Sequence, residues 1–388
     1  MKKILLVDNS SWNIYNFRLP LVKRLTAEGY QVTVATPVDE YIRYLDQTDF
    51  NQHIQLKRLA REGKNPVQDL LLLWELFRLY RRLKPDLVLH FTIKANIYGS
   101  LAARLAGVPA VAVVTGLGYT FLHPHGWNYF IPWLYRVAFG RLAKLVTYNP
   151  DDQAVFINNN IVEAERCIMM PGSGVPTKRF QPLPKLDEVG RKFIFLFIGR
   201  LLWDKGLMEY LHAAREIRKT RTDVECWVVG DYRESNPSGV PKSQLLEWVE
   251  NQDIRYIGRV MDVRTIIRQA DVLVHPSYRE GIPRVVIEAM SMAKPVITTN
   301  VAGCRETVQH GKNGFIVPPK DAGALALAME TMLDFTPSEL EKMGNWSREL
   351  ACQLFDENIV TSAYLKLFDE LFGIKKGEPA KQKGPAIF

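Results

Sequence analysis

The sequence predicts an α/β protein of two domains, each built on a parallel β-sheet with helical crossovers. Short runs rich in β-branched and aromatic residues alternate with longer amphipathic segments along the whole chain. That alternation is typical of parallel strands joined by helices. The chain has 388 residues, which is enough for two hydrophobic cores.

Six strands and four helices are expected in the first half. The strands are Lys3–Val7, Gln31–Thr36, Ile54–Lys57, Asp86–Phe91, Ala110–Thr115 and Lys144–Tyr148, and the helices are Phe17–Ala27, Val67–Leu83, Ala95–Leu105 and Phe130–Leu142. The next segment, Pro171–Lys192, is rich in Pro, Gly and Lys and has little periodicity, so we place a linker there.

The alternation restarts after the linker. The expected strands are Phe193–Ile198, Glu225–Gly230, Ile254–Ile257, Val272–His275, Val296–Thr299 and Phe315–Val317. The last amphipathic helix, Asp356–Phe372, is long enough to cross back to the first half. We therefore assign a first domain to residues 1–170 with the helix 356–372, and a second domain to 171–355. A tail, 375–388, is expected to be disordered. Two halves of similar size suggest a ligand cleft between them.

Composition narrows the class of protein. Lysine and arginine number 50 against 42 acidic residues, a net charge of +8, which favours an anionic partner. No nucleic-acid-binding motif accompanies this charge, so nucleic acid is not expected as a partner.

The apolar run at the start ends at Asp8, too early for a signal peptide, and no run reaches the roughly 18–20 apolar residues of a spanning helix. We expect a cytoplasmic protein, soluble or peripheral to a membrane. The four cysteines are scattered, so we expect reduced thiols and no metal site.

The motif with the most chemistry is Ser277–Met290, in which a strand is followed by a loop and then by a helix that begins near Pro283. Proline suits a helix start because the amide that it lacks would be unpaired there. Free amides at Arg284 and the next residue would face a phosphate. Glu280 precedes the helix and Glu288 lies within it, so the two carboxylates can contact different parts of one ligand. The alternative is a surface loop and a helix with one solvent-facing glutamate.

A second motif, Phe197–Gly206, again joins a strand to a helix. Gly199, at the end of the strand, lets the backbone approach a ligand. Arg200 and Lys205 could clamp a diphosphate, the arginine as a fork and the lysine as a point charge. The alternative is a basic loop that is merely solvated.

Together these motifs resemble the family 4 glycosyltransferases, whose GT-B fold has two Rossmann-like domains facing across a cleft. The pair Gly-Arg…Lys-Gly and Glu-Gly-x-Pro…Glu occurs in the family's order, and the second motif resembles its E-x7-E signature. The resemblance covers residues 1 to about 372. Further matching segments are Pro171–Val175, Ala270–Ser277, Lys294–Ile297, Gly303–Glu306 and Gly311–Phe315.

The resemblance implies roles for these residues. Arg200 and Lys205 would bind the donor diphosphate, Glu280 would hold hydroxyls of the transferred sugar, and Glu288 would bind the ribose. Tyr256 and Arg259 would lie where such enzymes seat the nucleobase. The backbone that would contact the phosphates or the sugar belongs to Gly199, Gly281, Ile282, Pro283, Arg284 and Val285. The family retains the anomeric configuration and needs no metal or other cofactor, and the chain has no Asp-x-Asp motif.

The first half resembles a narrower subgroup, the PglA-like N-acetylgalactosaminyltransferases and related capsule and O-antigen enzymes. These extend glycans on undecaprenyl diphosphate. The resemblance implies a UDP-sugar donor, in this subgroup a UDP-N-acetylhexosamine, and an acceptor linked to polyprenyl diphosphate. The resembling segments are Asn9–Pro20, Ile93–Gly99 and Thr115–Gly118. Many family members have paired glycines where this chain has Ser10 and Ser11. The residues expected to bind the acceptor are Ser10, Ser11, Lys94, Asn96, Gly116 and Gly118. For Lys94, a solvent-exposed lysine at a helix start is the alternative.

Other readings remain open at this point. His275 ends a strand beside the cleft and is interpreted as structural. A UDP-N-acetylglucosamine 2-epimerase has the same fold but lacks the arrangement of Glu280 and Glu288. A non-catalytic nucleotide-sugar binder would not need Glu280. Two stretches could attach the protein to the inner face of the plasma membrane, at an anionic surface. One is the aromatic run Phe121–Leu134, and the other is the basic run Lys57–Lys64 with the helix after it, which ends in Arg78, Arg81, Arg82 and Lys84. The alternative for these runs is an ordinary charged surface and a helix core.

Overall fold

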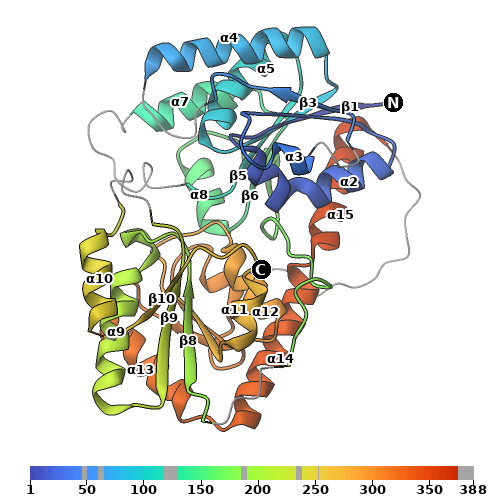
Figure 1. Cartoon of the computed structure of the whole chain (residues 1–388). Coiled ribbons are helices and arrows are strands. Elements are labelled where there is room, and N and C mark those ends of the chain that lie inside the picture. The colour runs from blue at the N-terminus through green and yellow to red at the C-terminus, as the bar shows by residue number, and fades with distance from the viewer. Residues whose placement is uncertain are drawn as a thin grey trace.

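The computed structural model describes residues 1–45, 50–59, 65–117, 130–184, 190–232, 238–251 and 253–374. Its strands form two parallel sheets, one from each half of the chain, and the first half lies above the second in Figure 1. The predicted class, two α/β domains on parallel sheets, is confirmed. No helix in these described ranges is long and apolar enough to cross a membrane.

The first sheet has seven strands in the order β3-β2-β1-β4-β5-β6-β7. Strands β1, β4 and β5 consist almost wholly of buried residues, as expected for parallel strands covered on both faces. The strand bounds are β1 Lys3–Val7, β2 Gln31–Thr36, β3 Gln52–Gln55, β4 Leu87–Phe91, β5 Ala110–Val114, β6 Lys144–Thr147 and β7 Cys167–Met169.

The helices of the first domain include two π-helical segments, η1 and η2, at the turns where β1 and β4 lead into helices. Helix α4 is capped by Asn65, whose side chain accepts hydrogen bonds from the amides of Val67 and Gln68, and Pro66 occupies its first position. The bounds are α1 Ser11–Asn13, η1 Ile14–Arg18, α2 Leu19–Ala27, α3 Ile42–Leu45, α4 Pro66–Leu83, η2 Ala95–Gly99, α5 Ser100–Ala106, α7 Phe130–Phe139, α8 Pro150–Asn158 and η4 Ala164–Arg166.

The second sheet has six strands in the order β10-β9-β8-β11-β12-β13. The chain order reverses between β8 and β11, which are neighbours in the sheet. In open α/β sheets, ligands bind at the carboxyl ends of the strands where this reversal occurs. The bounds are β8 Phe193–Ile198, β9 Val224–Val229, β10 Arg255–Gly258, β11 Val272–His275, β12 Val296–Thr299 and β13 Gly314–Val317.

The helices of the second domain cover both faces of this sheet. Helix α14 begins with a capping box in which Thr336 and Glu339 bond each other's backbone amides. The bounds are η5 Trp203–Lys205, α9 Leu207–Thr220, α10 Lys242–Glu250, α11 Arg264–Gln269, α12 Arg284–Ser291, η6 Arg305–Thr307, α13 Ala322–Leu333 and α14 Pro337–Leu354.

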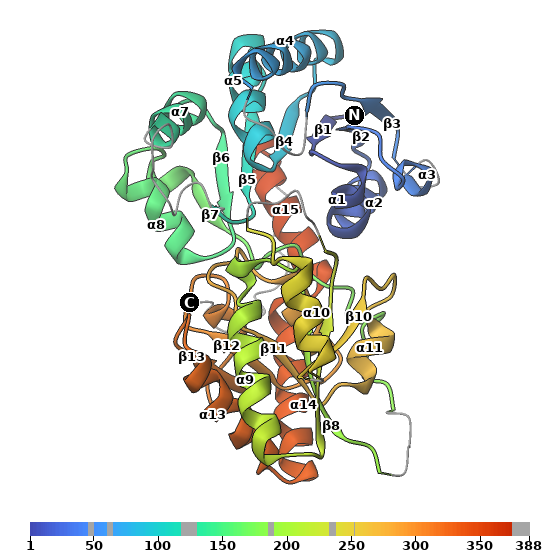
Figure 2. The same ribbon diagram turned by 60° about the vertical axis from the view of Figure 1, so that its left-hand side comes forward.

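The final helix, α15 (Glu357–Phe372), returns to the first domain, as the sequence predicted. Figure 2 shows α15 running up into the first domain while α14 stays with the second. Tyr364 and Phe368 are buried in the same apolar cluster as residues of β1 and β4. The last helix of the chain therefore completes the core of the first domain.

The predicted boundaries fail mainly at the edges of the first sheet. The third strand is Gln52–Gln55 rather than Ile54–Lys57, and β7 was not predicted. Both are short edge strands with no fully buried residue, so hydrophobic periodicity hardly marks them. The first helical region also starts earlier, at Ser11, because Ser10 caps it by accepting a hydrogen bond from the Asn13 amide.

Candidate active site

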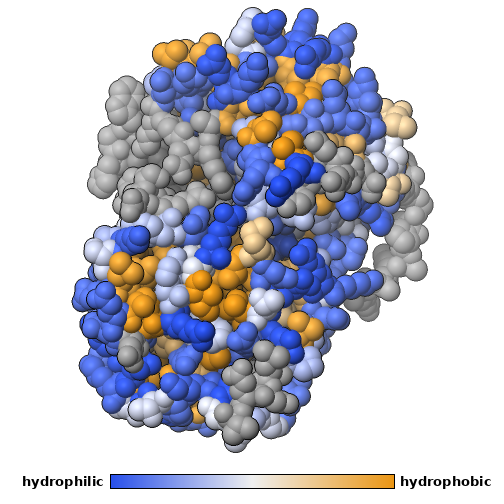
Figure 3. Space-filling model, in the orientation of Figure 1, coloured by the Kyte–Doolittle hydropathy of each residue, from blue (hydrophilic) through white to orange (hydrophobic). Residues whose placement is uncertain are grey.

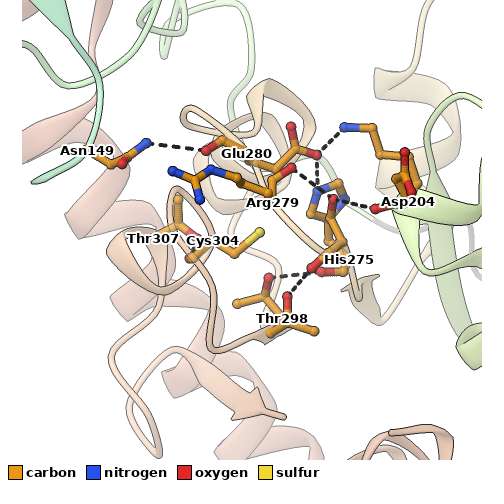
Figure 4. A network of polar contacts seen from close by, with 11 residues as sticks. Asn149, Asp204, His275, Arg279, Glu280, Thr298, Cys304 and Thr307 are labelled. Atoms are coloured by element: carbon orange, nitrogen blue, oxygen red, sulfur yellow. Dashed lines mark hydrogen bonds and ion pairs between the residues drawn. The ribbon is translucent and has the colours of Figure 1, made fainter. Parts of the chain in front are cut away.

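Two loops meet at the carboxyl ends of β8 and β11 and bring Lys205 and Glu280 together. Lys205 ends η5 after β8, and Glu280 lies in the loop between β11 and α12. The Lys205 ammonium forms an ion pair with Oε1 of Glu280. The same oxygen lies 3.0 Å from Nε2 of His275 (Figure 4). The two motifs found in the sequence, 75 residues apart at these side chains, thus form one site at the reversal point of the sheet.

The surroundings of Glu280 favour its charged form. Burial by itself raises the pKa of this carboxyl, but the positive charge of Lys205 and the hydrogen bond from His275 act in the opposite direction and prevail. The pKa of Glu280 therefore lies well below its usual value. Its side chain is 16% exposed, which leaves a carboxylate available to accept hydrogen bonds from a ligand.

His275 lies beside Glu280, a contact that the sequence interpretation, which treated this residue as structural, did not predict. The ring is 2% exposed, and its Nδ1 has no hydrogen-bond partner among the residues that the structure describes. With Nε2 protonated and Nδ1 bare, the ring donates to Glu280 without burying a second unpaired N–H. Thr298 fixes the backbone from beneath by donating its hydroxyl to the His275 carbonyl at 2.9 Å (Figure 4).

The loop after β8 is held close to the loop after β11 by a glycine. Gly206 has a φ of +70°, and a Cβ there would lie 2.0 Å from the Pro276 carbonyl oxygen. Gly199 continues β8, and its amide bonds the Val229 carbonyl at 3.0 Å. Arg200 is exposed, and its side chain has no hydrogen bond or ion pair with any residue that the structure describes. Lys205 therefore points into the site, whereas Arg200 is available at its surface.

Helix α12 begins one residue later than expected, with Pro283 as its N-cap. The Val286 amide already bonds the Pro283 carbonyl, so Arg284 and Val285 supply the first amides of the helix. Glu288 lies on the helix as predicted but forms an ion pair with Arg284 at 2.9 Å. Burial raises the pKa of Glu288, and Arg284 opposes this shift only in part. The glutamate expected to bind ribose is thus engaged by its own helix in this structure.

The loop that carries Glu280 also forms the contact between the domains. Gly281 is buried, and a Cβ there would lie 2.1 Å from the Thr115 carbonyl oxygen at the end of β5. Gly116 lies against the Gly281 amide. From the end of β6, the Asn149 side-chain amide donates to the Glu280 carbonyl at 3.3 Å (Figure 4). It also donates to the Gly281 carbonyl at 3.0 Å. Ile282, the next residue, packs against apolar clusters of both domains.

Two ion pairs flank this contact. Arg279, next to Glu280, pairs with Asp152, and Arg305 pairs with Asp151, both acids lying in the first turn of α8. Asp152 is fully buried, and burial raises its pKa although Arg279 opposes the shift. The first domain therefore holds the backbone around Glu280 through an amide and two carboxylates.

The pair expected near the nucleobase makes different contacts. Tyr256 donates its hydroxyl to the Gly230 carbonyl at 3.0 Å. Arg259 reaches the first domain, where it donates to the Tyr41 hydroxyl at 3.3 Å and lies 3.5 Å from Glu40. Arg259 therefore bridges the domains in this structure, and its expected place beside a base stays a prediction.

The residues expected to bind an acceptor are mostly engaged within the first domain. Asn96 is buried and donates to the Val113 carbonyl at 3.0 Å, so it supports β5 and does not face an open surface. Lys94 is largely buried and paired, because its ammonium lies 2.7 Å from Asp69 in the first turn of α4.

The loop after β1 is similarly packed. Ser10 is buried and caps α1, while the Ser11 hydroxyl bonds the Thr36 hydroxyl at 2.9 Å and the Pro37 carbonyl at 3.0 Å. Both serines therefore fix the loop in this structure, and their expected role in binding the acceptor stays a prediction. Gly116 alone of this set reaches the contact with Gly281. Gly118 lies outside the described residues.

Three further residues that shape the site were missed from the sequence. Asn149 follows a strand and precedes proline and two aspartates, a helix N-cap pattern that could have drawn attention to it. Asp152 and Arg279 carry no signal of pairing, since 127 residues separate them. Such contacts between domains depend on the tertiary structure and leave no local pattern.

Two models of known protein families match this chain, one in each domain. The family model "Glycosyl transferase 4-like" matches residues 3–149, and "Glycosyl transferases group 1" matches residues 192–334. The first match ends at Asn149 and the second includes both site loops. The chain belongs to the family 4 glycosyltransferases. The resemblance stated from the motifs is confirmed.

Two relatives and one solved structure place this glycosyltransferase more closely. It is 28% identical over 381 residues to the N,N'-diacetylbacillosaminyl-diphospho-undecaprenol alpha-1,3-N-acetylgalactosaminyltransferase of Campylobacter jejuni, covering 94% of this chain and 98% of the relative. It is 26% identical over 287 residues to the UDP-Gal:alpha-D-GlcNAc-diphosphoundecaprenol alpha-1,3-galactosyltransferase of Escherichia coli, covering 69% and 71%. A glycosyltransferase structure from Rickettsia africae aligns with a TM-score of 0.79 at 19% identity over 96% of this chain and 99% of that one. The GT-B fold is confirmed.

Proposed function

We propose that this glycosyltransferase moves a sugar, an N-acetylhexosamine, from a UDP-sugar onto a saccharide linked to polyprenyl diphosphate, in the synthesis of a cell-surface glycan. The observation that carries the proposal is the Glu280 carboxylate, held charged by Lys205 and His275 at the reversal point of the second sheet. Both relatives described above act, by their names, on diphospho-undecaprenol-linked sugars, one as an N-acetylgalactosaminyltransferase and one with UDP-galactose.

The chain's own charges suit departure of a nucleoside diphosphate. The Lys205 ammonium and the exposed Arg200 belong to the loop after β8, and the first amides of α12 follow the loop after β11. Such groups stabilise the charge that develops on a leaving diphosphate. In the structure Lys205 is paired with Glu280, and we propose that it exchanges part of this contact for a phosphate oxygen when the donor binds. Glu280 then accepts hydrogen bonds from the hydroxyls of the transferred sugar.

We further propose that transfer retains the anomeric configuration and needs no metal. Both relatives form alpha linkages by their names, and an α-configured donor would give them with retention. The cations Arg200 and Lys205 would balance the phosphate charge in place of a metal ion. The diphosphate itself can accept the acceptor's proton as it leaves, so that a general-base side chain is not required.

The test is a donor screen with a short-chain polyprenyl-diphosphate saccharide as acceptor. UDP-N-acetylgalactosamine, UDP-N-acetylglucosamine, UDP-galactose and UDP-glucose are each supplied in EDTA, and UDP release, product mass and the anomeric coupling constant are measured. We expect UDP release only when acceptor is present, with an α-linked product from a UDP-N-acetylhexosamine. Interconversion of the donor without acceptor would instead establish an epimerase. Donor binding without turnover on any acceptor would establish a binder.

The proposed acceptor also implies where in the cell the enzyme acts. A polyprenyl diphosphate is anchored in a bilayer, so we propose that the enzyme acts as a peripheral protein at the cytoplasmic face of the plasma membrane. Of the segments expected to attach it, Lys57 and Arg58 are exposed and Trp133 is exposed on α7. Arg61, Lys64 and residues 121–129 lie outside the described residues.

A further inference from the structure

Helix α4 carries an outward face whose two halves differ in chemistry. Val67, Leu70, Leu71 and Trp74 are large apolar side chains exposed in its first turns, with Leu70 at 65% and Trp74 at 56%. The exposed residues of the last turns are Arg78, Arg81 and Arg82. At 100° per residue all seven positions fall on one side of the helix, opposite the buried Leu72, Leu76 and Leu79.

This face is free of negative charge. Helix α4 contains two carboxylates, Asp69 and Glu75. Asp69 turns inward, where it accepts bonds from Lys94 and the Tyr98 hydroxyl. Glu75 lies at the rim and accepts the backbone amides of Lys57 and Arg58 at 2.9 and 3.0 Å. The outward face therefore offers apolar surface and arginine charge without an acid to compete for it.

The position of this face is also informative. Figure 1 shows α4 along the top of the first domain, on the side away from the second. Figure 3 shows hydrophobic side chains at the upper left, where α4 begins. The Lys94–Asp69 pair places the apolar turns of α4 next to the carboxyl end of β4, because Lys94 follows that strand directly. Carboxyl ends of parallel strands share one edge of a sheet, so the apolar end of α4 lies towards the edge that carries the Gly116 contact.

We propose that the outward face of α4 is the surface by which this enzyme docks on an anionic bilayer. A helix that lies in the interface buries apolar side chains in the acyl boundary, and its basic residues contact anionic headgroups. Tryptophan is enriched at this depth, which suits Trp74 at the border between the two halves. The arginines select an anionic lipid surface over a second copy of the chain, whose α4 would present the same positive charge. The inference rests on the proposed function for its biological purpose, but not for its geometry.

The test measures binding to vesicles apart from activity. Purified full-length enzyme is sedimented with vesicles of 30% phosphatidylglycerol in phosphatidylethanolamine, and with pure phosphatidylcholine vesicles. The variants are Leu70→Ser with Trp74→Ser, and Arg78→Gln with Arg81→Gln. The matched control is Leu327→Ser, because Leu327 is also 65% exposed but lies on α13 of the second domain. Circular dichroism melting verifies that each variant folds.

The apolar variant is expected to weaken binding to anionic vesicles at least 30-fold, and each arginine replacement to weaken it about fivefold. Leu327→Ser should bind as the wild type does. Transfer to a short soluble acceptor should be unchanged in all variants, whereas transfer to a long-chain acceptor in vesicles should fall with binding. The proposal is overturned if both α4 variants bind vesicles as well as the wild type does. It is also overturned if the wild type does not bind anionic vesicles. Self-association that the α4 variants abolish, with vesicle binding intact, would assign the face to a second copy. If instead the proposed function is wrong, the wild type will still bind vesicles but will transfer no sugar to the soluble acceptor.

Discussion

A methyl group added at Gly281 is expected to disable transfer while leaving both domains folded. Its Cβ would lie 2.1 Å from the Thr115 carbonyl oxygen and 2.7 Å from the carbonyl carbon. Ordinary contacts of this kind are about 3.5 Å, so the two backbones must separate by about 1 Å or more. Neither atom belongs to a flexible side chain, and Gly281 has no left-handed φ to complicate the change. The separation also stretches the 3.0 Å bond from Asn149 to the Gly281 carbonyl, worth about 1 kcal/mol.

Because Glu280 adjoins Gly281, a displacement of this size moves the carboxylate relative to the acceptor side of the site. Misplacement by about 1 Å can cost roughly 100-fold in rate. We expect Gly281→Ala to lower kcat about that much, with near-normal binding of UDP measured by calorimetry. The control is Gly323→Ala on α13, where the added Cβ meets only the Asp321 side chain at 3.4 Å. Wild-type kcat in a folded Gly281→Ala enzyme would refute the view that the domain contact positions Glu280.

Four further outcomes are expected. Glu280→Gln and Glu288→Gln should each lower kcat at least 100-fold with unchanged melting temperature, since loss of a positioned charge costs about 3 kcal/mol; near wild-type turnover by folded Glu280→Gln would contradict its role. Lys205→Ala should raise the Kd for UDP, and the wild-type enzyme should stay active in EDTA. Loss of wild-type activity on chelation, restored by magnesium, would contradict the proposal that Arg200 and Lys205 balance the phosphate charge without a metal. His275→Leu should lower kcat about tenfold with little change in KM, because Lys205 then holds Glu280 alone, and His275→Gln should recover part of the rate; equal rates for the two variants would show that the bond to Glu280 is unimportant. Burial lowers the pKa of His90 from 6.5 to about 3, so the unfolded chain takes up a proton that the folded one excludes. The free energy of unfolding should therefore fall by up to about 1.4 kcal/mol per pH unit below pH 6.5. Measured by urea unfolding between pH 7 and 5, it should fall less steeply with pH in His90→Gln than in the wild type.

Local sequence determined the central strands and not the edges. Phe193–Ile198, Val272–His275 and Val296–Thr299 were predicted to the residue, because each is a buried run of mainly β-branched, leucine and aromatic residues between turn signals. The edge strand Gln52–Gln55 has two exposed glutamines and offers no such run. The π-helical turns after β1 and β4 were also not predicted, since helical periodicity does not distinguish them from α-helix.

The site divides in a similar way. Glu280 and Lys205 were found from their motifs, yet their mutual ion pair joins residues far apart in sequence and was not predictable. Arg259 was assigned to a base because it follows a strand of the second domain, but the structure places it against Tyr41 and Glu40 of the first. Contacts across the domain boundary depend on how the two sheets are oriented, and one-dimensional patterns do not contain that orientation.

The return of α15 to the first domain sets the order in which the protein can mature on the ribosome. The first sheet is complete in sequence at Met169, yet Tyr364 and Phe368 fill its core. At about 5–20 residues per second, the roughly 200 intervening residues take on the order of 10–40 s to synthesise. Throughout that time the domain made first has an open apolar groove, while β8 to β13 and α14 emerge and can fold. The second domain can therefore fold before the core of the first is complete. A nascent chain stalled between these points is a natural client for chaperones, and loss of the final helix would damage the half of the protein synthesised earliest.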